Sequence, residues 1–194
     1  MINKIKKYVK KYAMGFTLVE TLVAVVVLMT AIAGPLTIAS KSLQATLVAK
    51  DQDTAFYLAQ DAMEYIRFVR DTNKLSGGDW LTGAGATVPA NAKDLTPCEG
   101  ASGCYFDSLG NNPSVITACS GACGPIYYDP TNDYFTYNTT GTTQTIFTRT
   151  VQILTPVGGN GNEVEAIAST TVSWQDTAGL TRQVQVREDI FNWQ

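Results

Sequence analysis

The stretch 15-GFTLVETLVAVVVLMTAIAGPLTIA-39 decides the fold, because it joins an apolar run of membrane-spanning length to one ionisable residue. A helix needs about 20 mostly apolar residues to cross the hydrocarbon core of a bilayer. Glu20 is the fifth residue of the run, counted from Phe16. A carboxylate inside a bilayer costs on the order of 2.5 kcal/mol or more, so Glu20 should have a partner or a task. We therefore expect a membrane helix over residues 16–39 with Glu20 as its functional group.

A basic leader precedes this run. It contains no acidic residue and five lysines, Lys4, Lys6, Lys7, Lys10 and Lys11. Positive charge beside a membrane helix stays on the cytoplasmic side, so the rest of the chain should be exported. In a secretory signal the cleavage site follows the apolar core. Here the candidate site precedes it, and cleavage after Gly15 would keep the helix and create a new N-terminus at Phe16.

The lysine-rich leader, Gly15, Phe16, the apolar run and Glu20 together resemble the prepilin signature of type IV pilins and secretion pseudopilins. The resemblance covers residues 1 to about 71 and, more loosely, residues 164–194. It implies that a prepilin peptidase of the membrane cuts after Gly15 and methylates the amine of Phe16. It also implies that other pilin subunits and an inner-membrane assembly platform are partners.

In that family the glutamate, here Glu20, pairs with the terminal amine of a neighbouring subunit. A buried carboxylate and a buried ammonium are each costly alone, and their pairing removes much of the penalty. The implied location is the cytoplasmic membrane for a single-pass precursor with an exported C-terminal domain. An extracellular or periplasmic filament would follow.

The composition argues against nucleic-acid binding and against catalysis. Without the five leader lysines, nine basic residues face 17 acidic ones, a formal charge of −8. A general grip on nucleic acid needs a basic patch or stripe. The chain also has no histidine, which removes the commonest general base and metal ligand. We expect a protein that is not an enzyme, that has no general nucleic-acid binding and that has no cofactor.

The four cysteines lie in the part expected to be exported. They are Cys98, Cys104, Cys119 and Cys123. An even number in an oxidising compartment favours two disulfides, with three connectivities open, of which Cys98 with Cys104 and Cys119 with Cys123 is the local one. A zinc site and free thiols are the alternatives. The spacings lack the tight paired pattern of zinc ribbons.

The helix should continue beyond the membrane as an amphipathic segment over residues 40–73. Gly34 and Pro35 should bend or loosen it, since proline removes a backbone hydrogen bond. Arg67 and Arg70 should form a solvated face. The apolar stripe expected to pack on a sheet consists of Leu43, Leu47, Ala55, Leu58, Ala62, Ile66 and Val69.

The remainder divides into a loop region and a sheet region. Residues 74–124 are rich in glycine and carry the cysteines, which predicts a long loop stapled by disulfides. Residues 125–194 show strand patterns, with Trp174 expected in the core between helix and sheet. The expected strands are 126–128, 134–137, 144–155, 164–174 and 181–190. The predicted fold class is α+β, a long N-terminal helix packed on a C-terminal antiparallel sheet as in pilins.

Two acidic turns leave calcium open as an alternative to the absence of a cofactor. One contains Asp129, Asn132 and Asp133, and the other contains Asn160, Asn162 and Glu163. Carboxylate and amide oxygens are calcium ligands, although ordinary turn chemistry explains both sequences as well.

The expected function is that of a structural subunit of a type IV pilus. The stapled loop favours a minor subunit, and the C-terminal hairpin is similar to that of the minor pilin branch linked to pilus modification. A pseudopilin of a type II secretion system and a DNA-uptake pilus are alternatives of the same class. A single-pass anchored surface binding protein or enzyme, whose N-terminus is never processed, is the alternative from a different class.

Overall fold

A computed structural model describes residues 15–87, 93–109, 115–155 and 164–192. The chain divides into two compact units, Met1–Leu47 and Val48–Gln194. Helix α1 (Leu18–Leu75) contributes to both. The predicted α+β class is confirmed: a long, N-terminally apolar helix packs against an antiparallel sheet.

The first unit consists of the apolar part of α1. Its described residues, 15–47, are all exposed, because no other element of this unit covers them. Leu43 and Leu47 are among them, at 64% and 43% exposure, so their predicted place in the packing stripe is wrong. The buried stripe begins later, at Ala55, where the core of the second unit begins.

The sheet of the second unit is antiparallel and is built around β5 (Thr143–Leu154). On one side, β5 pairs with β6 (Glu165–Gln175), which pairs with β7 (Thr181–Phe191). On the other side, β5 pairs with β3 (Pro125–Asp129) and, farther along, with β1 (Cys104–Tyr105). The short strand β4 (Tyr134–Thr136) pairs with β3. The short strand β2 (Thr117–Ala118) pairs with β1.

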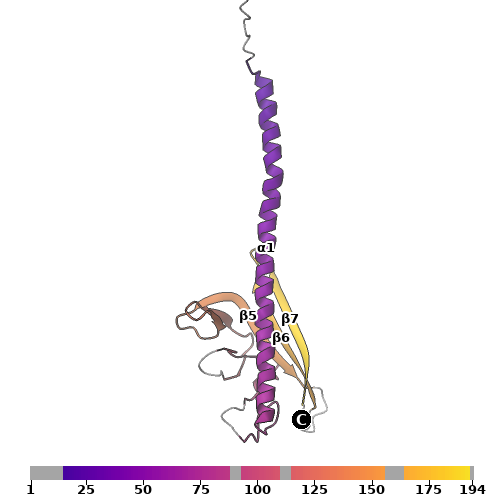
Figure 1. The fold of residues 1–194 in the computed structure, drawn as a ribbon, viewed down its shortest axis with the longest axis vertical. Helices are drawn as coiled ribbons and strands as arrows, with labels where there is room; N and C mark the ends of the chain where they lie inside the picture. Colours follow the sequence, from indigo (N-terminus) through magenta and orange to yellow (C-terminus); the bar gives the residue numbers. More distant parts are fainter. Residues whose placement is uncertain (1–14, 88–92, 110–114, 156–163, 193–194) are drawn as a thin grey trace, which may run out of the picture. The chain divides into compact units, whose positions relative to one another are not determined.

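The core lies between the sheet and the second half of α1, which crosses the strands β5, β6 and β7 in Figure 1. The inward strand positions alternate as the sequence pattern predicted, with Val172 and Ile190 fully buried. Trp174 is 4% exposed and contacts Phe147 at a ring separation of 5.9 Å, so its predicted place in the core is confirmed. The helix contributes Ala55, Leu58, Ala59, Ala62, Met63, Tyr65, Ile66 and Val69.

Helix α1 ends in a Schellman motif. The N–H of Gly78 donates to the carbonyl of Asn73, and the N–H of Gly77 donates to that of Lys74. Gly77 has a φ of 74°, the left-handed conformation that this motif requires. The buried Asn73 side chain then binds the carbonyls of Trp80 and Lys93 at 3.2 and 2.8 Å. The loop region is therefore anchored to the helix end.

The region predicted as a stapled loop contains more secondary structure than its composition indicated. Besides β1 and β2, it includes the 3-10 helix η1 (Thr96–Cys98). Gly103, just before β1, has a φ of 68°, and a Cβ there would lie 2.5 Å from the carbonyl oxygen of Val151 on β5. The lack of a side chain at Gly103 lets this loop approach the sheet closely enough to add two strands.

Candidate functional site at the start of the helix

The residues singled out at the N-terminal junction lie at the first turn of α1. Gly15, Phe16 and Thr17 precede the helix and are exposed. Thr17 caps the helix, because its Oγ1 accepts a hydrogen bond of 3.2 Å from the N–H of Glu20. The spacing Thr-x-x-Glu is that of a capping box. Glu20 therefore lies where the partial positive charge of a helix N-terminus favours a carboxylate.

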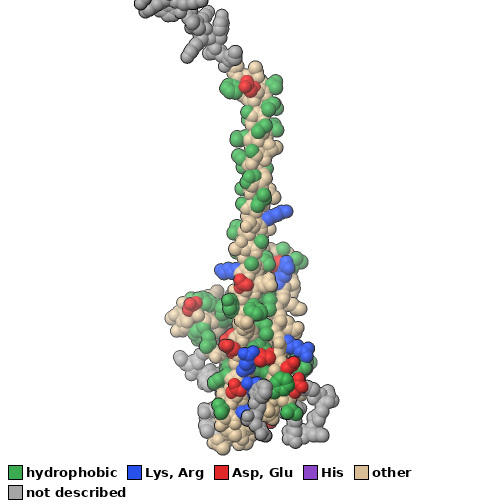
Figure 2. Space-filling view, turned by 45° about the vertical axis from the view of Figure 1, so that its right-hand side comes forward, with side chains coloured by type: hydrophobic (Ala, Val, Ile, Leu, Met, Phe, Trp, Pro, Cys, Tyr) green, Lys and Arg blue, Asp and Glu red, His purple; other side chains and the backbone are tan. Residues whose placement is uncertain are grey.

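The surroundings of Glu20 are apolar and lack any cover within the described chain. Thirteen large apolar side chains between Phe16 and Ile38 are exposed, from 47% at Val25 to 81% at Leu18. Figure 2 shows hydrophobic side chains along this part of α1. Within the part of the chain that the structure describes, α1 is the one helix long and apolar enough to cross a membrane. It fits a membrane anchor, which lipid or other helices would cover.

The hydroxyl groups of this segment are satisfied within the helix, so they do not oppose an apolar environment. From Thr21 to Ser40 each hydroxyl donates to a carbonyl three or four residues earlier, at 2.9 Å from Thr21 to Leu18 and at 2.9 Å from Ser40 to Leu36. Thr30 and Thr37 do the same. With these hydroxyl groups satisfied, the remaining polar side chain of concern is Glu20, which is the one ionisable residue from Phe16 to Ser40.

Gly34 and Pro35 lie inside α1, which continues through both. Pro35 has no N–H, so the carbonyl of Ala31 lacks its usual helical donor. Gly34 has open space where a side chain would be. The bend expected here stays a prediction.

The cysteines form two local disulfides, Cys98–Cys104 and Cys119–Cys123. The first joins η1 to β1, and the second follows β2. Sγ of Cys123 lies 3.7 Å from the carbonyl oxygen of Cys104, so the second disulfide packs on the backbone of β1. Together they hold the hairpin of β1 and β2 at the edge of the sheet.

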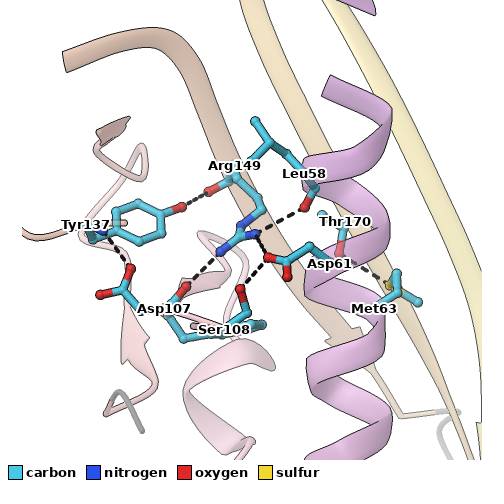
Figure 3. Close-up of polar contacts among 9 residues, drawn as sticks. Leu58, Asp61, Met63, Asp107, Ser108, Tyr137, Arg149 and Thr170 are labelled. Carbon is cyan, nitrogen blue, oxygen red and sulfur yellow. Dashed lines mark hydrogen bonds and ion pairs between the residues drawn. The ribbon is translucent and has the colours of Figure 1, made fainter. Parts of the chain in front are cut away.

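Arg149 of β5 is buried, at 4% exposure, and was not among the residues predicted from the sequence (Figure 3). Its guanidinium donates to the carbonyls of Leu58 and Phe106 at 3.1 and 2.8 Å, and to Oδ2 of Asp61 at 2.9 Å. Ser108 donates to the same carboxylate. Arg149 thus ties β5 to α1 and to the segment after β1. The sequence could have indicated the burial of Arg149 through its position in the strand. The inward positions of β5 are odd-numbered, as at Phe147 and Val151.

The two helix arginines differ from each other. Arg67 is about half exposed and makes a two-pronged pair with Glu188 of β7, whose hydrogen bonds raise the pKa of the guanidinium. Arg70 pairs with Asp71 on its own helix, and its side chain is only 13% exposed. The expected solvated face is therefore right for Arg67 and wrong for Arg70, which packs against the domain.

The first of the two acidic turns is held by its own hydrogen bonds. Asp129 accepts from the backbone of Thr131 and from the side chain of Asn132, and these bonds lower the pKa of its carboxyl, with the Asn132 amide as the main cause. Asp133 accepts from the Tyr128 hydroxyl. The described residues hold no cluster of three potential acidic, cysteine or histidine metal ligands. Asn160, Asn162 and Glu163 of the other turn lie outside the described residues.

Comparisons with known protein families, with curated proteins and with solved structures give no match to this chain.

Proposed function

We propose that this protein is a subunit, of minor abundance, of a type IV pilus filament. The precursor would be inserted in the cytoplasmic membrane through α1, cut after Gly15 by a prepilin peptidase and methylated on Phe16. The subunits would then be assembled through their apolar helices. The proposed role is structural, since the chain has no histidine and its cysteines are in disulfides.

The observation that carries the proposal is an uncovered apolar helix with one carboxylate in its first turn. Lipid alone would satisfy the apolar side chains but would leave Glu20 with the cost of a charge in hydrocarbon. The amine of a processed Phe16 on a neighbouring subunit supplies the opposite charge at the same depth. Pairing relieves the penalty of both groups and sets the register between subunits.

The features of the exported part favour a minor subunit over an abundant one. The stapled hairpin of β1 and β2 and the long closing hairpin of β6 and β7 support this assignment. A type II secretion pseudopilin would share the same processing and assembly chemistry. A surface protein anchored by an uncut helix would not.

The test begins with the N-terminus of the protein purified from its native membrane. Mass spectrometry should find a chain that begins with methylated Phe16, and an intact Met1 would reject the filament proposal. The second arm replaces Glu20 by Gln, which keeps its size and removes its charge. E20Q should reduce incorporation into sheared filaments, while the control E165Q, at an exposed position of β6, should not. Normal incorporation of E20Q would show that charge pairing is not needed.

A further inference from the structure

A cavity of about 490 Å³ lies beside the Cys119–Cys123 disulfide, remote in sequence from the N-terminal site. Three tyrosines line it: Tyr105 of β1, Tyr127 of β3 and Tyr137 after β4. The rest of its wall is the stretch 117–125, which includes the disulfide. Its volume lies in the range of about 300–1,000 Å³ that is typical of small-molecule sites.

The tyrosines are held in place before any ligand arrives. The rings of Tyr105 and Tyr137 lie 4.7 Å apart, tilted by 44°. The Tyr137 hydroxyl donates to the Arg149 carbonyl at 3.2 Å, and its backbone N–H donates to Asp107 at 2.6 Å. The strands of Tyr105 and Tyr127 both pair with β5, which fixes their separation. A preorganised wall lowers the entropy cost of binding.

The polar groups of the cavity are neutral. Its lining includes the hydroxyls of Thr117 and Ser120 and contains no Asp, Glu, Lys or Arg. The hydroxyls of Tyr105 and Tyr127 make no hydrogen bond within the described part of the chain, and both side chains are half-buried. By contrast, the cavities along α1 contain the acidic residues Asp61 and Glu64.

This combination selects the class of ligand. Aromatic faces favour flat or ring-shaped groups, and free hydroxyls favour a ligand with many hydrogen-bonding groups. Nucleobases also stack on tyrosine, but nucleotides carry phosphates that need cations, and this lining has none. A pyranose sugar has an apolar C–H face for stacking and hydroxyls around its rim, with no charge to neutralise.

We propose that this cavity binds a neutral glycan, with a pyranose ring stacked on Tyr105 or Tyr127 and its hydroxyls bonded to the phenols, Thr117 and Ser120. The disulfide holds the wall of the site, and Tyr137 forms its fixed floor. This site does not depend on the proposed filament, since all of its residues belong to the second unit.

The test uses the full chain in a detergent without a sugar headgroup. Saturation-transfer NMR and calorimetric titration would be run with glucose, galactose, N-acetylglucosamine and their β-linked disaccharides. We expect saturable binding at millimolar or lower concentration. Y105A and Y127A should each weaken it about tenfold or more, which corresponds to about 1.4 kcal/mol. The matched control is Y57A, at an exposed tyrosine of α1 outside the cavity.

Thermal unfolding of each variant separates loss of the site from loss of the fold. If Y105A unfolds early, Y105F provides the second test, because it keeps the ring and removes only one hydroxyl and should weaken binding less. No saturable binding of any of these sugars would overturn the proposal, as would equal binding by Y105A and Y127A. Tighter binding of adenosine monophosphate than of the sugars would also overturn it.

Discussion

Replacement of Arg149 by Met should destabilise the second unit, Val48–Gln194, more than replacement of any exposed arginine. The change removes two hydrogen bonds to the carbonyls of Leu58 and Phe106 and one to the carboxylate of Asp61. Methionine keeps most of the aliphatic volume, so the loss is mainly polar. It also removes the stacking of the guanidinium over Phe106, at 5.5 Å from the ring centroid.

The loss in free energy of unfolding depends on which partner groups of Arg149 remain unpaired after the substitution. Removal of one member of a buried ion pair costs about 3–5 kcal/mol, because the other charge is left buried and unpaired. The Asp61 side chain is 37% exposed and keeps the hydrogen bond from Ser108, so water offsets part of the loss. The low end, about 3 kcal/mol, is therefore expected. For a domain of this size that corresponds to a fall in Tm of about 10 °C.

The assay is thermal unfolding of the purified chain with its disulfides intact. Near-ultraviolet circular dichroism monitors the transition. The control is R187M, which removes an exposed arginine from the outer face of β7. D61N should also cost about 3 kcal/mol, because it leaves the buried charge of Arg149 without its carboxylate partner, although both carbonyl partners remain. A Tm of R149M close to that of R187M would refute the assignment of Arg149 as the link between helix and sheet.

Three further predictions concern the stability of the second unit. G103A should lower its stability strongly, by about 2–4 kcal/mol, since a Cβ there would collide with the Val151 carbonyl. The control G121A, at a φ of 92° in open space, should carry only the backbone cost of about 1–2 kcal/mol in denaturant unfolding. Backbone hydrogen bonds, mainly from the Leu180 N–H, lower the pKa of the Asp176 carboxyl in the folded state. The ionised carboxyl therefore stabilises the fold in full above its ordinary pKa of about 3.9, and this stabilisation is lost as the pH falls through the lower pKa of the folded state. D176N should therefore be less stable than wild type at neutral pH and approach it in acid, measured as the unfolding midpoint against pH. Reduction of both disulfides should cost about 2 kcal/mol each by loop entropy, seen as a lower denaturant midpoint.

The strands with a clear alternation were predictable from sequence. In β6 and β7 apolar residues occupy most of the alternate positions, and the strands were expected within a residue or two of Glu165–Gln175 and Thr181–Phe191. The end of α1 was expected at about Asn73 and lies at Leu75, two residues before the glycine that terminates it. In these elements local pattern and tertiary packing agree.

The elements missed by the sequence analysis depend on contacts between distant segments. Strands β1 and β2 have two residues each, too few to show a period, and they exist because Gly103 lets the chain approach β5. Arg149 resembles a surface charge in sequence, and only its inward register marks it as buried. The tyrosine cavity combines three strands with a disulfide loop, so no local motif could predict it.

The apolar helix and Glu20 act on very different energy scales. Thirteen exposed large apolar side chains, at about 1.5 kcal/mol or more each, favour removal from water by roughly 20 kcal/mol. That exceeds the usual stability of a whole domain, about 5–15 kcal/mol, and the cost of one carboxylate in hydrocarbon, about 2.5–3.5 kcal/mol. Glu20 therefore cannot keep the helix out of a membrane. In the proposed filament, pairing would relieve the penalty of Glu20 and the similar penalty of the amine, roughly 5–7 kcal/mol together. E20Q should therefore reduce subunit recruitment by no more than about 10⁵-fold. A larger loss would mean that Glu20 does more than pair with an amine.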